Sequence, residues 1–168
     1  MKSLELHDRL IKAQDLQQKV DSYMKVWKEN HIETALCEEF HEWYNALGLF
    51  KDWKKNKTAK EKQLDELADC LAFALSLLNH KHKTFSYDRC KFTLKRINNK
   101  EHKSAMLNEI KTGYLFNKRV GNTVYIQEPE NAIEWIIDIA ILFYTLGELF
   151  EAYEKKSLVN IQRQKDGY

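Results

Sequence analysis

Residues that interrupt helices are scarce in this sequence. Glycine occurs 5 times and proline once in 168 residues. These two residues cost the most free energy inside a helix and mark most turns. Their scarcity, together with frequent Leu, Lys, Glu and Ala, predicts an all-α protein. The length fits one domain, residues 1–168.

An excess of charge of one sign is also lacking, and so is a long apolar run. Lys and Arg total 27 against 25 Asp and Glu, a net charge of +2, which gives no reason to expect binding to nucleic acid or to a membrane. The most apolar run, residues 135–150, contains Asp138 and Glu148 and is too short and too charged for a transmembrane helix. The first residues lack the apolar core of a secretory signal. We therefore expect a cytoplasmic protein.

Cysteine is rare as well. Cys37, Cys70 and Cys90 are the three cysteines, and they form no CxxC pattern. Scattered cysteines in a helical chain indicate reduced, partly buried thiols and a reducing compartment.

Apolar residues recur at helical spacing along most of the chain. In the third expected helix, the nearly unbroken apolar stretch that ends it predicts burial on most sides. Gly48 is expected to end the second helix, and Thr58 with Glu61 to begin the third through a capping box. The four long helices are predicted over about residues 4–30, 32–47, 58–79 and 130–156.

The segment from about 80 to 128 has no clear apolar period. Short helices are predicted near 87–97 and 104–110. A small β-hairpin is predicted near 119–127, where Gly121-Asn122 favours a tight turn. The polar tail, residues 157–168, is expected to become ordered only when a ligand binds.

Two acidic pairs are the first candidates for a functional site: Glu39 with Glu42, and Glu66 with Asp69. Residues three apart lie on one face of a helix. If the two helices face each other, four carboxylates meet at one place, as hard cations require. Such pairs also arise by chance, and ion pairs with basic residues are the competing explanation. For the third pair, Glu148 and Glu151, we favour that structural role.

Asp69 lies among apolar neighbours, residues 67–73. An ionised carboxylate there is unfavourable by several kcal/mol unless positive charge meets it, so we expect a cation or a basic side chain beside it. The third helix has no histidine where a ferritin-like Glu-x-x-His pair requires one. Carboxylates without histidine favour Mg²⁺, with Mn²⁺ as the alternative.

Two basic segments could bind a phosphorylated ligand. Residues 50–55 combine lysines with aromatic rings, which suits a ligand with a ring and phosphates; a solvated basic loop with Trp53 packed on the core is the alternative. The tail carries polar side chains at helical spacing that could fold over phosphates, although a frayed polar C-terminus has a similar composition. These tail residues are Tyr153, Lys156, Asn160, Arg163 and Gln164.

Together these segments resemble the dimeric dUTPases, of the all-α NTP pyrophosphatase superfamily that includes the MazG-like enzymes and has phage-encoded members. The similarity is strongest over residues 33–78 and 150–168 and weak over 80–130, and we interpret residues from about 80 to 128 as a variable insert. The matching motifs are EFHEW at 39–43, FKDW at 50–53, LDELAD at 64–69 and NIQRQKDGY at 160–168.

The resemblance implies a role for each matching residue. The metal ligands would be Glu39, Glu42, Glu66 and Asp69, holding Mg²⁺ against the substrate phosphates, and Glu39 would also orient or deprotonate the attacking water. Trp53 would line the base pocket, with Lys51 near the phosphates. A C-terminal tail, about 153–168, would close over the triphosphate through Lys156, Asn160 and Arg163.

An N-terminal helix in this family reads uracil through a Gln and, four residues later, an Asn or an acidic residue. Gln17 and Asp21 match this spacing best, with Gln14 and Gln18 as competitors. Two departures concern the pocket: Ala72 stands where many members have His, and Ser157 where the tail often has Asn.

The resemblance implies hydrolysis of dUTP, with dUDP left open, to dUMP and pyrophosphate by in-line attack of water at the α-phosphorus. It also implies a homodimer and, as in phage-encoded members, a repressor or other regulatory protein as partner. The alternatives are a MazG-like pyrophosphatase with other or broader dNTP specificity and a dUTPase-like module that only binds a regulatory protein.

Overall fold

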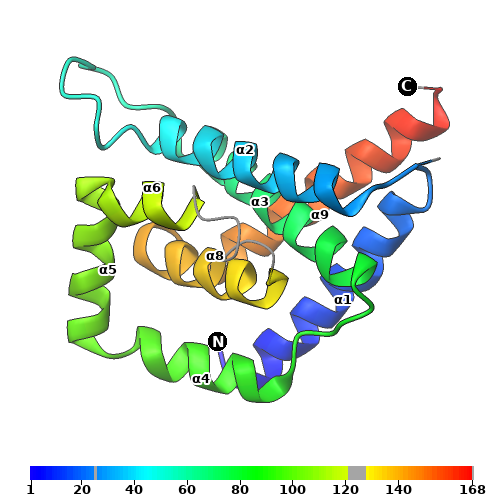
Figure 1. The fold of residues 1–168 in the computed structure, drawn as a ribbon, viewed down its shortest axis with the longest axis horizontal. Coiled ribbons are helices and arrows are strands. Elements are labelled where there is room, and N and C mark those ends of the chain that lie inside the picture. Colours follow the sequence, from blue (N-terminus) through cyan, green and yellow to red (C-terminus); the bar gives the residue numbers. More distant parts are fainter. Residues whose placement is uncertain (25, 121–127, 168) are drawn as a thin grey trace.

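The computed structural model describes residues 1–24, 26–120 and 128–167, apart from the side chains of residues 114–116. Within these residues the chain forms helices and no strand (Figure 1), so the predicted all-α class is confirmed. The β-hairpin predicted near 119–127 lies outside the described residues, except that Arg119 and Val120 end a helix. No described helix has both the length and the apolar character needed to cross a bilayer.

One helix forms the centre of the bundle. Helix α3 packs against α1, α2, α8 and α9. The three helices α4, α5 and α6 surround α8 on three sides in Figure 1. The helices are α1 (Ser3–Asp21), α2 (Glu29–Leu47), α3 (Lys60–His80), α4 (Tyr87–Ile97), α5 (Lys100–Thr112), α6 (Tyr114–Val120), α8 (Pro129–Phe143) and α9 (Leu146–Lys165).

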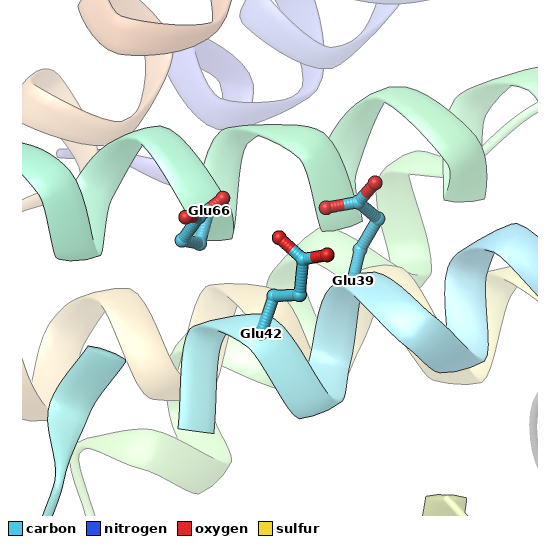
Figure 2. A group of neighbouring side chains, drawn as sticks. All are labelled: Glu39, Glu42 and Glu66. Atoms are coloured by element: carbon cyan, nitrogen blue, oxygen red, sulfur yellow. The ribbon is translucent and has the colours of Figure 1, made fainter. Parts of the chain in front are cut away.

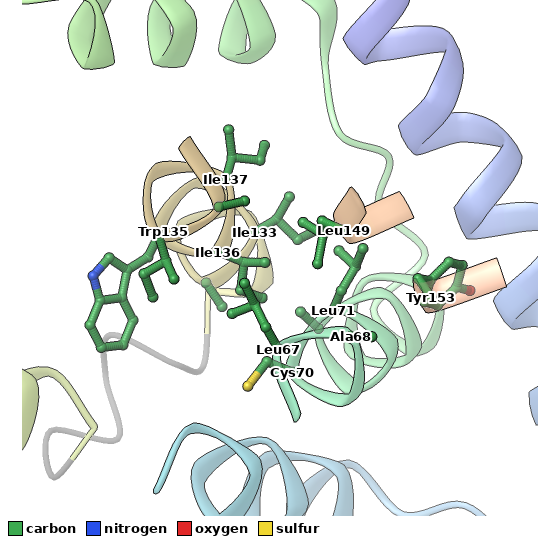
Figure 3. Close-up of a cluster of buried hydrophobic side chains, with 14 of the residues drawn as sticks. Leu67, Ala68, Cys70, Leu71, Ile133, Trp135, Ile136, Ile137, Leu149 and Tyr153 are labelled. Carbon is green, nitrogen blue, oxygen red and sulfur yellow. The ribbon is translucent and has the colours of Figure 1, made fainter. Parts of the chain in front are cut away.

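Apolar residues of α3 form the middle of the core, as the sequence predicts. Leu67 and Leu71 are fully buried between α8 and α9, where they meet Ile136 and Leu149 (Figure 3). Complete burial of a leucine side chain contributes roughly 1.5–3 kcal/mol. The predicted burial of this part of α3 on most sides is therefore confirmed.

The end of α2 agrees with the prediction from the sequence, whereas the start of α3 does not. Gly48 ends α2 with a φ of 66° and a backbone N–H bond to the Tyr44 carbonyl, a left-handed conformation that glycine adopts without steric cost. The predicted Thr58 capping box is wrong, because Ala59 is the N-cap of α3 and has no side-chain acceptor. The Thr58 hydroxyl accepts a hydrogen bond from Lys54 instead.

Helix α1 ends nine residues earlier than the predicted 4–30. The Ser22 hydroxyl donates to the Lys19 carbonyl at 2.7 Å, and this local bond competes with continuation of the helix. Met24 and Trp27, whose spacing suggested a longer helix, lie beyond its end and line a cleft instead.

The last helix is not continuous over 130–156 but divides at Tyr144. Thr145 has an extended backbone, and its side chain and that of Glu148 form a reciprocal capping box that starts α9, which satisfies backbone donors at the helix start. Glu148 also pairs with Lys60 at 2.5 Å, so the structural role expected for this acidic residue is confirmed. Helix α9 then continues to Lys165, so most of the tail, predicted at 157–168, is helical.

The middle segment contains more helix than the sequence indicates. Helix α4 coincides with the predicted 87–97, α5 extends the predicted 104–110 at both ends, and α6 was not predicted. Cys37, Cys70 and Cys90 are free, and the last two are buried, which confirms the prediction of free, partly buried thiols.

Candidate active site

Three carboxylates from two helices meet between α2 and α3. Glu39 and Glu42 project from α2 toward Glu66 on α3 (Figure 2). One oxygen of each lies within 4.8 Å of the others. We call these three residues the carboxylate cluster. Facing helices thus bring together both predicted acidic pairs, apart from Asp69.

Basic side chains compensate part of this negative charge. Lys62 pairs with Glu66 one helical turn away. Asp69 accepts a hydrogen bond from Lys156 on α9, so the positive partner expected beside Asp69 is present. Among the described residues, no ion pair involves Glu39 or Glu42.

The pKa values reflect the remaining negative charge. Burial, the Asp69 carboxylate and the Glu42 carboxylate raise the pKa of Glu39 to about 7. Burial also raises the pKa of Asp69, although the hydrogen bond from Lys156 opposes that shift. Oxygen ligands that repel one another fit a hard divalent cation, which removes the repulsion.

A cleft of about 450 Å³ opens beside the cluster, between α1, α3 and α9. Glu39 and Asp69 line it, so the cleft and the carboxylate cluster are continuous. Six further residues predicted from the sequence or the resemblance line the same cleft: Gln17, Asp21, Tyr153, Lys156, Asn160 and Arg163.

Helix α9 presents its cleft residues on one face, since they recur every three or four positions. Lys156 and Asn160 are half-buried and Arg163 is exposed. The predicted tail residues therefore lie beside the cleft as part of a formed helix.

Gln17 and Asp21 belong to a buried hydrogen-bond network at the α1 end of the cleft. Gln17 Nε2 donates to Asp21 Oδ1 at 2.9 Å and to Ser76 Oγ at 3.0 Å. The Tyr153 hydroxyl donates to the Ala13 carbonyl at 2.8 Å and lies 3.0 Å from Gln17 Oε1. Burial raises the pKa of Asp21, against the effect of the hydrogen bonds from Gln17 and Ser76.

The competing glutamines have other surroundings. Gln14 donates to the Asn79 side chain and to the Lys83 carbonyl at 2.9 and 2.7 Å, which ties α1 to the end of α3. Gln18 is exposed. Of the three candidates, only Gln17 lines the cleft.

Sequence reasoning missed the apolar wall of the cleft. Trp27 and Phe73 line it with their ring centroids 6.0 Å apart. Phe73 follows Asp69 by four residues, so helical spacing could have predicted that the two share a face of α3. Ser76, three residues after Phe73, lies on the same face. Trp27 has no such signal, because it lies between helices.

Lys51 and Trp53 do not line this cleft. They belong to the loop between α2 and α3, where Lys51 lies over the Phe50 ring and Trp53 meets that ring edge-on at 6.2 Å. Trp53 is 73% exposed, so the alternative in which it packs on the core is wrong. Within this single chain, most residues of the basic segment 50–55 are exposed.

An all-α bundle with a carboxylate cluster open to a polar cleft is suited to a phosphorylated ligand. The chain belongs to the all-α dimeric dUTPase family, because the dUTPase family model matches residues 4–168. It is therefore a dUTP diphosphatase. No curated protein matches the chain significantly.

Proposed function

We propose that this dUTP diphosphatase requires Mg²⁺, with Mn²⁺ as a substitute, and releases dUMP and pyrophosphate. The observation that carries the proposal is that Glu39 belongs both to the carboxylate cluster and to the wall of the cleft. A substrate in the cleft therefore has its phosphates beside the acidic side chains.

Glu39, Glu42 and Glu66 would hold the ion, with Asp69 as a further ligand. When bound, the ion supplies positive charge that offsets the substrate phosphates and favours deprotonation of water. Lys156, Asn160 and Arg163 bind the triphosphate from α9 by charge and hydrogen bonds. Glu39 orients the water and accepts its proton as the water attacks the α-phosphorus in line, and pyrophosphate leaves.

The base occupies the α1 end of the cleft in this proposal. Trp27 and Phe73 supply an apolar wall for the ring, and Asp21 faces its polar edge. Gln17 and Ser76 hold Asp21 in position through their hydrogen bonds. Buried polar groups left without a partner by a wrong base lower its affinity.

We also propose that the chain forms a homodimer. Lys51 and Trp53 are outside the cleft of their own subunit, and in the proposed dimer they reach the cleft of the second copy. Sedimentation of the wild type and Trp53→Ala tests this: a dimer with a raised KM in the variant supports it. A monomeric active enzyme would contradict it.

Pyrophosphate release from dUTP, dTTP, dCTP and UTP, with and without Mg²⁺, tests the proposed reaction. Turnover of dUTP that requires the metal and is lost in Glu39→Gln supports it. Comparable turnover of all four nucleotides would favour a MazG-like activity. Absence of turnover from a folded protein would contradict catalysis and favour a module that binds a regulatory protein.

A further inference from the structure

The near-neutral net charge of the chain conceals an uneven distribution of charge. Helices α4, α5 and α6, residues 87–120, carry nine Lys and Arg against three Asp and Glu. The rest of the chain accordingly has more acidic than basic residues. In Figure 1, α4 and α5 run along the lower and left edges of the molecule. A basic surface of this kind attracts polyanions.

Much of this positive charge is not compensated within the chain. Arg89 and Arg96 pair with Glu134 on α8, but six lysines of these helices form no ion pair within the part of the chain that the structure describes. They are Lys91, Lys95, Lys100, Lys103, Lys111 and Lys118, all exposed except Lys103, which is half-buried. Asp88 and Glu101 offset part of their charge. The lysines therefore remain available to the phosphates of a partner.

An exposed aromatic ring lies among these lysines. Phe92 on α4 is 60% exposed, between Lys91 and Lys95 in the sequence. The Arg96 guanidinium lies 5.6 Å from the centroid of the Phe92 ring. Arg96 in turn donates to Glu134 and Asp138 of α8 at 2.8 and 2.7 Å. These two hydrogen bonds hold the guanidinium in place, so the ring has a fixed support while most of its surface is open to a ligand.

A shallow pocket of about 300 Å³ beside the ring supplies polar contacts. It is lined by Phe92, Lys95, Arg96, Asn99 and His102. Asn99 Oδ1 accepts the backbone N–H groups of Glu101 and His102 at 2.8 and 3.1 Å, which caps α5. The amide Nδ2 of Asn99 has no acceptor among the described residues and is free to donate. None of the five lining residues lines the cleft beside the carboxylate cluster.

This combination suits a single strand of nucleic acid. An unpaired base can stack on the open face of Phe92, and such stacking tolerates any base, because every base has a π face. A duplex keeps its bases stacked on one another, so it can use the lysines but not the ring. An acidic protein segment likewise offers charge without a flat ring. The exposed ring among uncompensated lysines therefore favours the single strand.

We propose that the outer face of α4 and the start of α5 bind single-stranded nucleic acid, by stacking of a base on Phe92 and contacts of Lys91 and Lys95 with phosphates. The Asn99 amide donates to a base or phosphate oxygen. The inference goes beyond the proposed hydrolysis and does not depend on it, since the two surfaces share no residue.

The test is fluorescence anisotropy of a labelled oligothymidylate of about 20 nucleotides, titrated with the full chain. We expect a wild-type Kd below about 100 μM at about 50 mM NaCl, weakening as salt is added. Phe92→Leu removes the ring but keeps an apolar side chain, and it should raise the Kd by roughly fivefold or more. Lys95→Gln should lower the slope of log K against log salt by about 0.7.

Two controls accompany these variants. Lys12→Gln should leave the Kd unchanged, because Lys12 is exposed on α1 and lines neither the pocket nor the cleft. Excess dUMP, which the proposed function places in the cleft, should not displace the oligonucleotide.

Three outcomes overturn the inference and leave the proposed hydrolysis intact. One is a wild-type Kd above about 100 μM at the lower salt, which does not depend on whether any variant folds. Another is an affinity that Phe92→Leu leaves unchanged and that a duplex or poly-glutamate of the same length matches, which would indicate a general site for polyanions. The third is displacement by dUMP, which would place the oligonucleotide in the cleft.

Discussion

Lys156 on α9 donates a hydrogen bond to the Asp69 carboxylate on α3, 87 residues away in the sequence. This contact places a cation from the tail beside the acidic residues of the central helix. It also supplies the positive charge that the apolar surroundings of Asp69 require. The same lysine lines the cleft, so one side chain joins two helices and also borders the proposed site.

Replacement of Lys156 by Met should therefore affect both properties. We expect about a tenfold or larger rise in KM for dUTP and a loss of about 1–3 kcal/mol in unfolding free energy, since a charge-assisted hydrogen bond is removed. Steady-state kinetics and urea unfolding measure the two effects. Lys156→Arg keeps the charge and is the control. An unchanged KM in Lys156→Met would mean that the lysine serves the fold alone.

Removal of one carboxylate from the cluster should abolish most of the activity. For Glu42→Gln and Glu66→Gln we expect a fall in kcat/KM of about 100-fold or more and a higher Mg²⁺ requirement, because each loses a charged metal ligand. Glu38→Gln is the control, being exposed on α2 and outside the cluster. Mg²⁺ titrations after treatment with EDTA give the measurement. Full turnover in EDTA would exclude the metal requirement.

The Tyr153 hydroxyl should stabilise the contact between α1 and α9. Tyr153 is 1% exposed, and its hydroxyl donates to the Ala13 carbonyl at 2.8 Å. Tyr153→Phe leaves that buried carbonyl without this donor, and we expect a loss of about 1–3 kcal/mol in urea unfolding. Tyr87→Phe, at a 44% exposed position, should change little. Equal effects of the two substitutions would contradict the assignment.

Arg96 should stabilise the fold in a pH-dependent way. It donates to the buried Asp138 carboxylate at 2.7 Å, with His102 at 3.6 Å. Burial raises the pKa of Asp138 above its ordinary 3.8, and Arg96 opposes that shift. Arg96→Met therefore raises this pKa further and leaves a buried charge poorly compensated, at a cost of about 3–5 kcal/mol near pH 8.

This cost should decrease as the pH falls toward the ordinary carboxyl value. The folded variant then binds a proton that the unfolded chain does not yet bind, so protonation favours the folded state. Unfolding free energies of the variant and the wild type at pH 8 and pH 5 measure the difference. Lys95→Met, at an exposed position on the same helix, is the control. A difference independent of pH would rule out Asp138 as the cause.

Local sequence determined the helical class, the end of α2 at Gly48 and the two acidic pairs. Spacing along a helix suffices for such features, because residues three or four apart share a face whatever the helix packs against. It also contained the start of α9, since Thr145 and Glu148 form a capping box by their own proximity. We did not predict this helix start because Thr145 and Glu148 lie within the apolar run of residues 135–150.

Only the tertiary structure decided which residues share the site. That Glu66 meets Glu42 while Asp69 meets Lys156 depends on the packing of α2 and α9 on either side of α3, which no local pattern encodes. The choice of Gln17 over Gln14 depends on which side of α1 faces Ser76. Trp27 lines the cleft because α1 ends at Asp21, so that Trp27 is not part of the helix. These contacts join residues far apart in the chain, and burial of the apolar faces sets them.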